Sequence, residues 1–217
     1  MKSSTKGLFF PILLILLACA PTRSYAASNV YELTLANSSV LATFPNDGTV
    51  YGLVTAEKTG SNTFTVTFAT TPALNTLYGG TPPLHTVGAN LTGDLGLLTV
   101  NVGTGYKDVG PKNLNGFDVF EEVAQQKTGN SGTNPAVWTV TTTNAISETF
   151  TDFLTTNDDG RHAVIHPINN VNTGITGHFT DGQGSTVIPE LPAGSLPILG
   201  SLLSSVIFWL RRRFSHA

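Results

Sequence analysis

Four residues late in the chain carry side chains of the kinds that bind metal ions. His162 and His166 are four positions apart on a predicted strand, so both rings should lie on one face of a sheet. His178 and Asp181 follow nearby, and imidazole and carboxylate groups are ordinary zinc ligands. A three-ligand metal site is one interpretation. Because Pro167 ends the strand at once and no position for a catalytic water is indicated, we expect polar histidines at a sheet edge and no metal.

An oxygen-rich turn, Asn157-Asp158-Asp159-Gly160, precedes the histidines. Its composition is that of a calcium-binding turn, but it lacks the downstream glutamate spacing of an EF-hand loop. We expect it to end a helix and form a turn, with loose calcium binding as the alternative.

Two groups of carboxylates raise the question of hydrolysis. Asp118, Glu121 and Glu122 form one group, and Glu148 and Asp152 form another on a predicted helix. A pair of carboxylates can hydrolyse glycosides when it is held about 5 to 9.5 Å apart in a cleft. Adjacent glutamates on a strand point to opposite faces, so we expect solvated charge rather than a catalytic pair.

Other catalytic and cofactor signatures are missing from the sequence. It contains no Gly-x-Ser-x-Gly elbow and no Rossmann or P-loop glycine pattern. We therefore expect no catalytic residue, no metal and no cofactor.

Several aromatic residues are of a kind that stacks against sugar rings when exposed: Tyr51, Tyr78, Tyr106 and Trp138. Trp138 lies in an alternating strand and is expected in the core. Tyr78 and Tyr106 lie in glycine-rich segments and are the better candidates for contact with a polysaccharide, but we expect ordinary loop tyrosines, which are more common.

Alternating apolar and polar residues predict antiparallel strands in the first half of the chain. Phe64, Val66 and Phe68 alternate with threonines, and residues 31–35 alternate in the same way. Two further strands, at 40–44 and 49–56, flank an Asp-Gly hairpin turn, and residues 57–62 form the next connection. The prediction is a meander of four strands.

The second half predicts more strands and one helix. The expected strands are 97–102, 117–123, 136–143, 163–165 and 174–179, and the glycine- and proline-rich stretch 71–96 is expected to be a long surface loop. Ile146, Phe150, Phe153 and Leu154 fall on one helical face, with Asn144 as the N-cap. The predicted fold class is all-β: an antiparallel β-sandwich ectodomain over residues 27–186 with one short helix.

The first 26 residues have the layout of a secretory signal peptide. Lys2 and Lys6 precede an apolar segment at 8–18, and a polar stretch ends at Ala26, after which we expect cleavage. Cleavage there removes Cys19, the only cysteine, so the mature chain has no disulfide. The alternative is that Cys19 belongs to a lipobox and is retained as an acylated anchor.

The charge of the middle region excludes one class of partner. Residues 27–188 contain five lysines or arginines against thirteen aspartates or glutamates, a net charge of −8. Nucleic-acid binding needs a basic surface that contacts phosphates, so we expect no nucleic-acid partner.

The last thirty or so residues, starting at Val187, combine three features. Pro189-Glu190-Leu191-Pro192 is followed by an apolar span from Leu196 to Leu210 and then by Arg211, Arg212 and Arg213. The apolar span predicts a short transmembrane helix, and arginines directly after it favour a cytoplasmic membrane stop. Prolines on both sides of Glu190-Leu191 favour an extended, accessible backbone.

This order of parts resembles the PEP-CTERM sorting signal that exosortases recognise in Gram-negative bacteria that produce exopolysaccharide. The chain departs from the family pattern at Leu191, so that Pro-Glu-Pro becomes Pro-Glu-Leu-Pro. The segments 117–120, 138–140, 160–166 and 173–177 also look like the usual ectodomain of one group of these proteins. The resemblance implies a non-catalytic surface or matrix protein whose partners are an exosortase-type membrane enzyme and, transiently, the inner membrane.

The sequence therefore predicts a protein that is exported, held for a time in the inner membrane by its C-terminal span, and then placed at the cell surface or outside the cell. Extracellular polysaccharide is a further possible partner. The alternatives are a secreted polysaccharide-binding module or a glycoside hydrolase, retained by a plain C-terminal membrane anchor.

Overall fold

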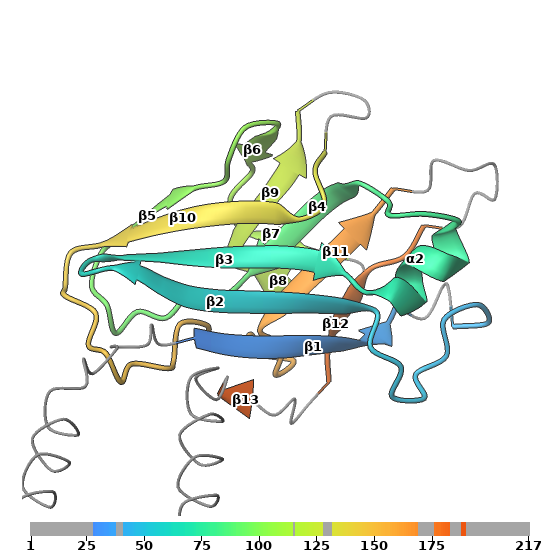
Figure 1. Ribbon diagram of the computed structural model, residues 1–217, viewed down its shortest axis with the longest axis horizontal. Helices are drawn as coiled ribbons and strands as arrows, with labels where there is room; N and C mark the ends of the chain where they lie inside the picture. Colours follow the sequence, from blue (N-terminus) through green and yellow to red (C-terminus); the bar gives the residue numbers. More distant parts are fainter. Residues whose placement is uncertain are drawn as a thin grey trace, which may run out of the picture.

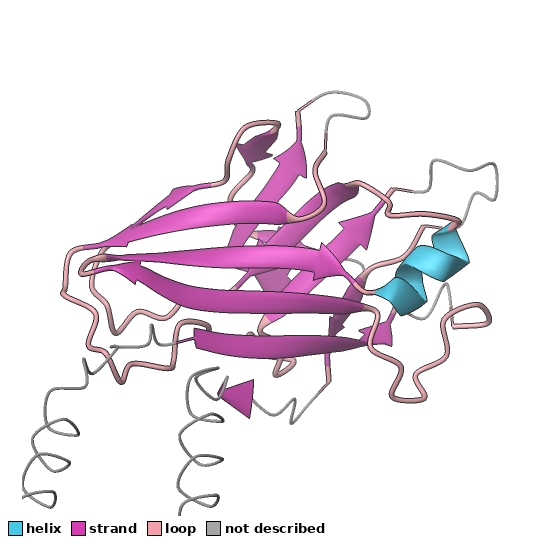
Figure 2. Cartoon of the chain, in the orientation of Figure 1, coloured by secondary structure: helices cyan, strands magenta, loops and turns pink. Residues whose placement is uncertain are grey.

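The computed structural model describes residues 28–37, 41–114, 116–127, 132–168, 176–182 and 188–189. In these ranges the chain forms mostly β-structure and one short helix, α2 (Pro72–Tyr78) (Figure 2). The strands are β1 (Ser28–Ala36), β2 (Gly52–Gly60), β3 (Thr63–Thr70), β4 (Leu84–Ala89), β5 (Leu98–Asn101), β6 (Tyr106–Asp108), β7 (Lys112–Asn113), β8 (Val119–Phe120), β9 (Glu122–Gln126), β10 (Ala136–Thr142), β11 (Ala163–Pro167), β12 (Phe179–Asp181) and β13 (Ile188–Pro189).

Most strands belong to one antiparallel sheet that curls on itself. Its strand order is β5-β10-β3-β2-β1-β12-β11-β4-β9-β6, and β13 pairs with β1 outside this path. β7 and β8 form a separate small pair. In Figure 1 the strands β10, β3, β2 and β1 cross over β4, β9 and β11. We call the strands from β5 to β1 the first half of the sheet and those from β12 to β6 the second half.

Side-chain alternation accounts for the strands of the first half, as the sequence predicts. Phe64, Val66 and Phe68 of β3 are completely buried, whereas the threonines between them are partly exposed. β10 shows the same alternation over seven residues. Full burial of a large apolar side chain contributes about 1.5–3 kcal/mol, so a strand with three such residues is fixed in register by its apolar face.

The predicted four-stranded meander has only three strands, β1, β2 and β3. The predicted strand at 40–44 is wrong, because residues 41–44 form a turn. Phe44 is nevertheless buried, with its ring 5.1 Å from that of Phe179. The predicted connection at 57–62 is also wrong in extent, because β2 continues to Gly60 and pairs there with Thr63.

The predicted helix over Ile146–Leu154 is wrong. This segment is irregular, although Ile146, Phe153 and Leu154 are buried as the helical pattern requires. Apart from one local bond, from Phe150 N–H to Ser147 O, its backbone bonds to other segments: the Ile146 N–H donates to Ser61 O, and Phe153 O accepts from Thr92 N–H. These long-range hydrogen bonds replace the i to i−4 bonds of a helix.

The helix lies instead in the stretch 71–96, which was predicted to be a long loop. Thr71 caps α2, since its Oγ1 accepts a hydrogen bond from Leu74 N–H, and Pro72 occupies the first helical turn. Gly79, with φ of 71°, ends the helix in the left-handed conformation. Strand β4 follows in the same stretch and pairs with β9 and β11.

Three of the other predicted strands are present with altered ends. Residues 97–102 contain β5, 136–143 contain β10, and 163–165 lie within β11. The predicted strand 117–123 is divided between β8 and the start of β9. The strand predicted at 174–179 is wrong in place, because residues 176–178 are not in a strand and β12 begins only at Phe179.

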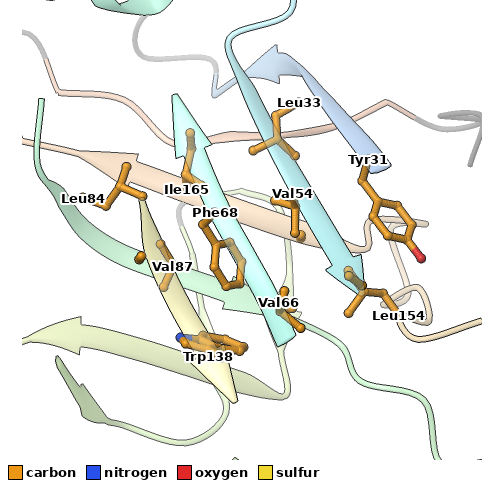
Figure 3. Close-up of a cluster of buried hydrophobic side chains, with 14 of the residues drawn as sticks. Tyr31, Leu33, Val54, Val66, Phe68, Leu84, Val87, Trp138, Leu154 and Ile165 are labelled. Carbon is orange, nitrogen blue, oxygen red and sulfur yellow. The ribbon is translucent and has the colours of Figure 1, made fainter. Parts of the chain in front are cut away.

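The main core lies between the two halves of the curled sheet (Figure 3). Phe68 and Trp138 of the first half belong to the same buried cluster as Val87 and Ile165 of the second half. Their burial from both sides stabilises the curl, because neither half can expose this face to water without losing the apolar contacts.

A second, smaller apolar cluster lies on the other side of the second half. Val123 of β9 and Val164 of β11 pack there with Leu114, Phe117 and Phe120. The residues on either side of Val164 belong to the main core, and successive residues of a strand point to opposite faces. The second half of the sheet is therefore covered on both faces, with the β7–β8 region on its outer face.

The predicted signal peptide with its cleavage site at Ala26, the predicted span 196–210, and Arg211, Arg212 and Arg213 lie outside the described residues. None of the helical structure in the described ranges has the length and apolar character needed to traverse a bilayer.

Candidate functional site

The structure separates the histidines that the sequence grouped together. His162 is not in a strand, since β11 begins at Ala163, and it pairs with Asp181. His166 and His178 lie elsewhere and contact each other, with His85 as a third member of their group. The alternative interpretation, in which His162, His166, His178 and Asp181 form one metal site, is therefore contradicted.

The buried carboxylate of Asp181 ties β11 to β12. Its Oδ1 accepts hydrogen bonds from the backbone N–H groups of His162 and Ala163, and its Oδ2 lies 2.6 Å from His162 Nδ1. Thr180 Oγ1 is 3.3 Å from the same carboxylate. A buried carboxylate requires partners of this kind, so Asp181 has a structural explanation at the point where the sheet curls.

The imidazole of His162 is held between Asp181 and Tyr31, whose ring centroid is 4.8 Å away. A carboxylate that orients an imidazole is also part of serine-protease triads, where the second ring nitrogen faces a nucleophile. The contacts of His162 within the described residues include neither a serine nor a cysteine. The arrangement orients the ring and anchors the strand end.

A small cavity of about 170 Å³ contains the remaining histidines, and we call it the histidine pocket. It lies on the outer face of the second half of the sheet, next to the second apolar cluster. Its lining residues come from five segments of the chain: His85, Thr86, Lys112, Asn113, Leu114, Gln125, His166 and His178.

Strand alternation and one irregularity bring these side chains together. Val164 is on the outer face, so His166, two residues further along β11, is on that face too. The pairing of β11 with β4 shifts in register between His166 and Pro167: His166 pairs with Thr86, and Pro167 pairs with Leu84. This bulge leaves His85 as the extra residue, and bulges characteristically re-aim side chains in this way.

The ring geometry of the pocket is that of a stack. The rings of His166 and His178 are parallel within 10°, with centroids 4.1 Å apart, and His85 meets His166 edge-on at 5.4 Å. Imidazole nitrogens bind metals in the plane of the ring, so two parallel stacked rings do not direct their lone pairs to one point. Accordingly, no group of three potential ligands that could hold a metal ion is found among the described residues.

Burial determines the protonation of these histidines. It lowers the pKa of His166 to about 3 and that of His178 to about 4, with further lowering from the neighbouring histidines and Lys112. The pKa of His85 is also lowered, first by burial and then by Lys112. The lowered pKa values favour the neutral form of all three rings at pH 7, and a neutral imidazole can donate one hydrogen bond and accept another.

Sequence reasoning missed His85 and Lys112 as members of this group. His85 shares no spacing with the later histidines, because β4 reaches β11 only through long-range sheet pairing. The alternation of 164 and 166 was visible in the sequence, but the bulge that turns His85 to the same face was not.

The carboxylates are not gathered into a cleft. Glu121 is exposed and Glu122 is partly buried, and neither lines the histidine pocket or the larger open depression of about 450 Å³ beside Lys58. Burial, followed by the charges of Asp108 and Glu121, raises the pKa of Glu122. Asp118, in a left-handed conformation with φ of 64°, precedes β8 and also lines neither cavity.

Glu148 and Asp152 do not share a helix face, because that helix is absent. Glu148 forms an ion pair with Lys58 of β2 at 2.5 Å, on the wall of the larger depression, and Asp152 is exposed. An ion pair this exposed contributes about 0–1 kcal/mol, so it is a surface contact rather than a catalytic arrangement.

The oxygen-rich turn at 157–160 is a turn, but it does not end a helix. Asn157 Oδ1 accepts from Arg161 N–H at 2.9 Å, and Asn157 Nδ2 donates to Phe117 O at 2.7 Å. Gly160 has a φ of 73°. The amide of Asn157 is thus used in shaping the turn, whereas Asp158 and Asp159 are exposed.

The aromatic residues considered as sugar contacts are all buried. Tyr78 is 5% exposed and Tyr106 is 2% exposed, and burial raises the pKa of Tyr78 to about 12. Tyr106 Oη donates to Leu84 O at 2.8 Å, as a buried tyrosine should. Trp138 belongs to the main core, as predicted, and so does Tyr51. Tyr78 ends α2 and Tyr106 begins β6, so these two are neither exposed loop tyrosines nor sugar contacts.

The predicted sorting motif begins within the sheet. Pro189 pairs with Asn29 and Ile188 pairs with Val30, so β13 lies along the first residues of β1. Of the four motif residues, only Pro189 is described, and Glu190, Leu191 and Pro192 lie outside the described residues. The start of the described fold and the start of the motif are therefore neighbours in space.

Comparisons of the chain with protein-family models, with curated proteins and with solved structures give no match.

Proposed function

We propose that this chain is an exported, non-catalytic protein of the cell surface or exopolysaccharide matrix, delivered through a C-terminal signal of the exosortase type. The observation that carries the proposal is the pairing of Pro189 with Asn29. It places the start of the Pro-Glu-Leu-Pro motif beside the strand that begins two residues after the predicted signal-peptide cleavage at Ala26.

This pairing suits a protein with a membrane segment at each end. The two segments join the folded region at neighbouring points, so a β-sandwich ectodomain can stand on one side of the bilayer while both are in the membrane. The arginines after the span 196–210 then face the cytoplasm, and the motif lies on the outer side, within reach of a membrane-embedded cysteine enzyme.

A non-catalytic role is supported by how the candidate catalytic groups are used. Asp181 and His162 form a strand anchor, and Glu148 is engaged by Lys58. Each of these groups has a structural partner, which favours an ectodomain that acts by its surface. Retention of labelled protein during electrophoresis in matrix polysaccharide, compared with a gel lacking it, tests the proposed polysaccharide partner.

The sorting proposal is tested by intact-mass measurement of the full-length chain expressed in a Gram-negative host with and without an exosortase-type enzyme. We expect the surface-extracted product to lack residues 1–26 in both hosts and residues 196–217 only in the host that has the enzyme. A product that keeps Arg211 to Arg213 in both hosts would instead show a plain membrane anchor.

Two matched variants separate recognition of the motif from general defects. Glu190→Ala should abolish the enzyme-dependent loss of the tail, because Glu190 is the only charged residue of the Pro-Glu-Leu-Pro motif. Glu121→Ala, an exposed glutamate outside the motif, should be processed like the unmodified chain. Equal processing of both variants would argue against recognition of the motif.

A further inference from the structure

We propose that the histidine pocket is a binding site for a small oxyanion, a carboxylate or phosphate group, and that binding is accompanied by uptake of protons. This site is separate from the sorting signal, and the inference does not depend on the proposed function.

The charge around the pocket is the first argument. The titratable groups that face it are His85 from β4, Lys112 from β7, His166 from β11 and His178 from the residue before β12. β9 contributes the neutral Gln125. Among the residues that the structure describes, no carboxylate lines this cavity, although residues 27–188 carry a net charge of −8. A pocket without acidic groups in so acidic a domain favours a negatively charged ligand.

The lining also supplies hydrogen-bond donors from several directions. Lys112 brings an ammonium group, Asn113 and Gln125 bring amide N–H groups, and Thr86 brings a hydroxyl. Thr86 Oγ1 is 2.9 Å from His85 Nδ1, so one hydrogen bond joins the hydroxyl to the ring. Convergent donors and a fixed positive charge are what an oxyanion requires.

The size and opening of the pocket limit the ligand. At about 170 Å³ it is smaller than the roughly 300–1,000 Å³ of sites for drug-sized molecules, so it suits a single charged group. Lys112 and Asn113 are exposed, which opens the pocket to solvent on the side of β7. A charged group at the end of a larger molecule, such as a uronic acid in a polysaccharide, can enter from there.

The stacked histidines account for the proton uptake. Burial and the neighbouring histidines and Lys112 keep the pKa values of His166 and His178 well below their ordinary value. An anion placed against the rings favours their charged forms and raises these pKa values. Protons are therefore bound together with the anion, and affinity must increase as the pH falls below 7.

The site also lies far from the proposed sorting motif. His178 O accepts from Asn37 N–H at 3.0 Å, just beyond the C-terminal end of β1, whereas Pro189 pairs at the N-terminal end of that strand. The separation along β1 is about 25 Å at roughly 3.3 Å per residue. Ligand binding and removal of the tail can therefore be measured independently.

The experiment is calorimetric titration of the full-length chain with sulfate, whose double charge does not change between about pH 5.5 and pH 7.5. At constant ionic strength, we expect the affinity to rise by up to about tenfold per pH unit for each proton taken up. Titration with phosphate and with glucuronate then shows which of the two oxyanion classes binds more tightly.

Lys112→Gln should weaken sulfate binding at every pH and leave its pH dependence in place, because it removes the fixed charge. Lys107→Gln, an exposed lysine of β6 outside the pocket, is the matched control and should bind like the unmodified chain. His166→Gln and His85→Gln should each reduce the pH dependence. Unchanged urea midpoints at pH 7.5 confirm that the variants are folded.

Sulfate affinity that is independent of pH, or equal in Lys112→Gln and the unmodified chain, would overturn the proposal. Stoichiometric zinc uptake at pH 7 that sulfate does not affect would also overturn it and assign the pocket to a metal. A reduced pH dependence in His166→Gln, with the full dependence kept in Lys107→Gln, would support it.

Discussion

At the scale of single residues, the chain uses its histidines in two different ways. His162 has a carboxylate partner, Asp181, and is part of a hydrogen-bonded anchor. His166 and His178 face each other, and the described lining of their pocket contains no carboxylate, so protonation of either places a positive charge beside the other ring and Lys112. Burial and the neighbouring positive groups therefore oppose protonation of the stacked pair in the folded state.

Acidification should destabilise the fold through the stacked pair. The folded-state pKa values, about 3 for His166 and about 4 for His178, lie below the ordinary value of 6.5. The unfolded chain therefore binds more protons between pH 6.5 and pH 4. The stability contributed by the neutral pair is complete above pH 6.5 and is progressively lost as the pH falls towards the folded values.

Urea unfolding in chloride buffers at about pH 7.5, 6.5 and 5.5 checks this expectation, since most carboxylates remain ionised in that range. We expect the free energy of unfolding to decrease across the range and the decrease to be smaller in His166→Gln. A free energy that stays constant down to pH 5.5 would show that the rings are not kept neutral by the fold.

At the scale of elements, strand β2 has a glycine at each end with a different role. A Cβ built on Gly52 would lie 2.6 Å from Ile165 Cδ1, 3.0 Å from Leu33 Cδ1 and 3.1 Å from Ala69 O. Gly52 thus allows β11 of the second half to approach the backbone of the first half. At Gly60 the same atom would meet only Thr63, at ordinary contact distances of 3.5 Å or more.

Gly52→Ala should destabilise the protein by about 1–3 kcal/mol, the usual cost of overpacking a core. Gly60→Ala should be neutral or stabilise by less than about 1 kcal/mol, because alanine reduces the entropy of the unfolded chain. The difference between their urea midpoints measures how tightly the two halves pack. Equal midpoints would show that the core opens to accept the extra methyl group.

Elements with strict alternation were predictable from the sequence, and those defined by long-range pairing were not. β3 and β10 follow the period-two rule, since one face is buried and the other is more exposed. β4 does not, because both of its faces are covered and it contains a bulge. In a glycine- and proline-rich stretch, this irregular burial was indistinguishable from that of a loop.

The helix was misplaced for a related reason. Ile146, Phe153 and Leu154 are all buried, but core packing at the end of a sheet can produce the same spacing without a helix. In α2 only Leu74 and Tyr78 are buried, so the apolar pattern was too short to recognise. The capping residues Thr71, Pro72 and Gly79 were the available signal.

Only part of the histidine pocket was predictable from the sequence. Alternation along a strand places Val164 and His166 on one face, whereas His85 reaches that face only through the pairing of β4 with β11 in the folded sheet.

At the scale of the whole molecule, the strand order determines how strongly each strand's backbone amides are protected from hydrogen exchange. β2 and β3 are paired on both sides along most of their lengths, whereas β5 and β6 end the sheet. Amides of central strands exchange only when larger parts of the structure open, whereas edge strands open locally.

Hydrogen exchange should therefore be slowest in β2 and β3 and fastest in β5 and β6. Because both edges are compared with strands of the same sheet, the result is independent of overall stability. Mass spectrometry of peptides after timed labelling gives the order. Protection in β5 equal to that in β2 would mean that the sheet opens as one unit or that another segment covers this edge.

The position of β1 also sets the order in which the molecule is completed. Leu33 of β1 pairs with Asp181 of β12, and Val30 pairs with Ile188 of β13, so the first described strand is joined by the last ones. Contacts between such distant parts of a chain form slowly. During synthesis from the N-terminus, the edge of β1 that pairs with β12 and β13 therefore lacks its hydrogen-bond partners until nearly all of the polypeptide has left the ribosome. Incomplete translation products must therefore remain susceptible to proteases and chaperones.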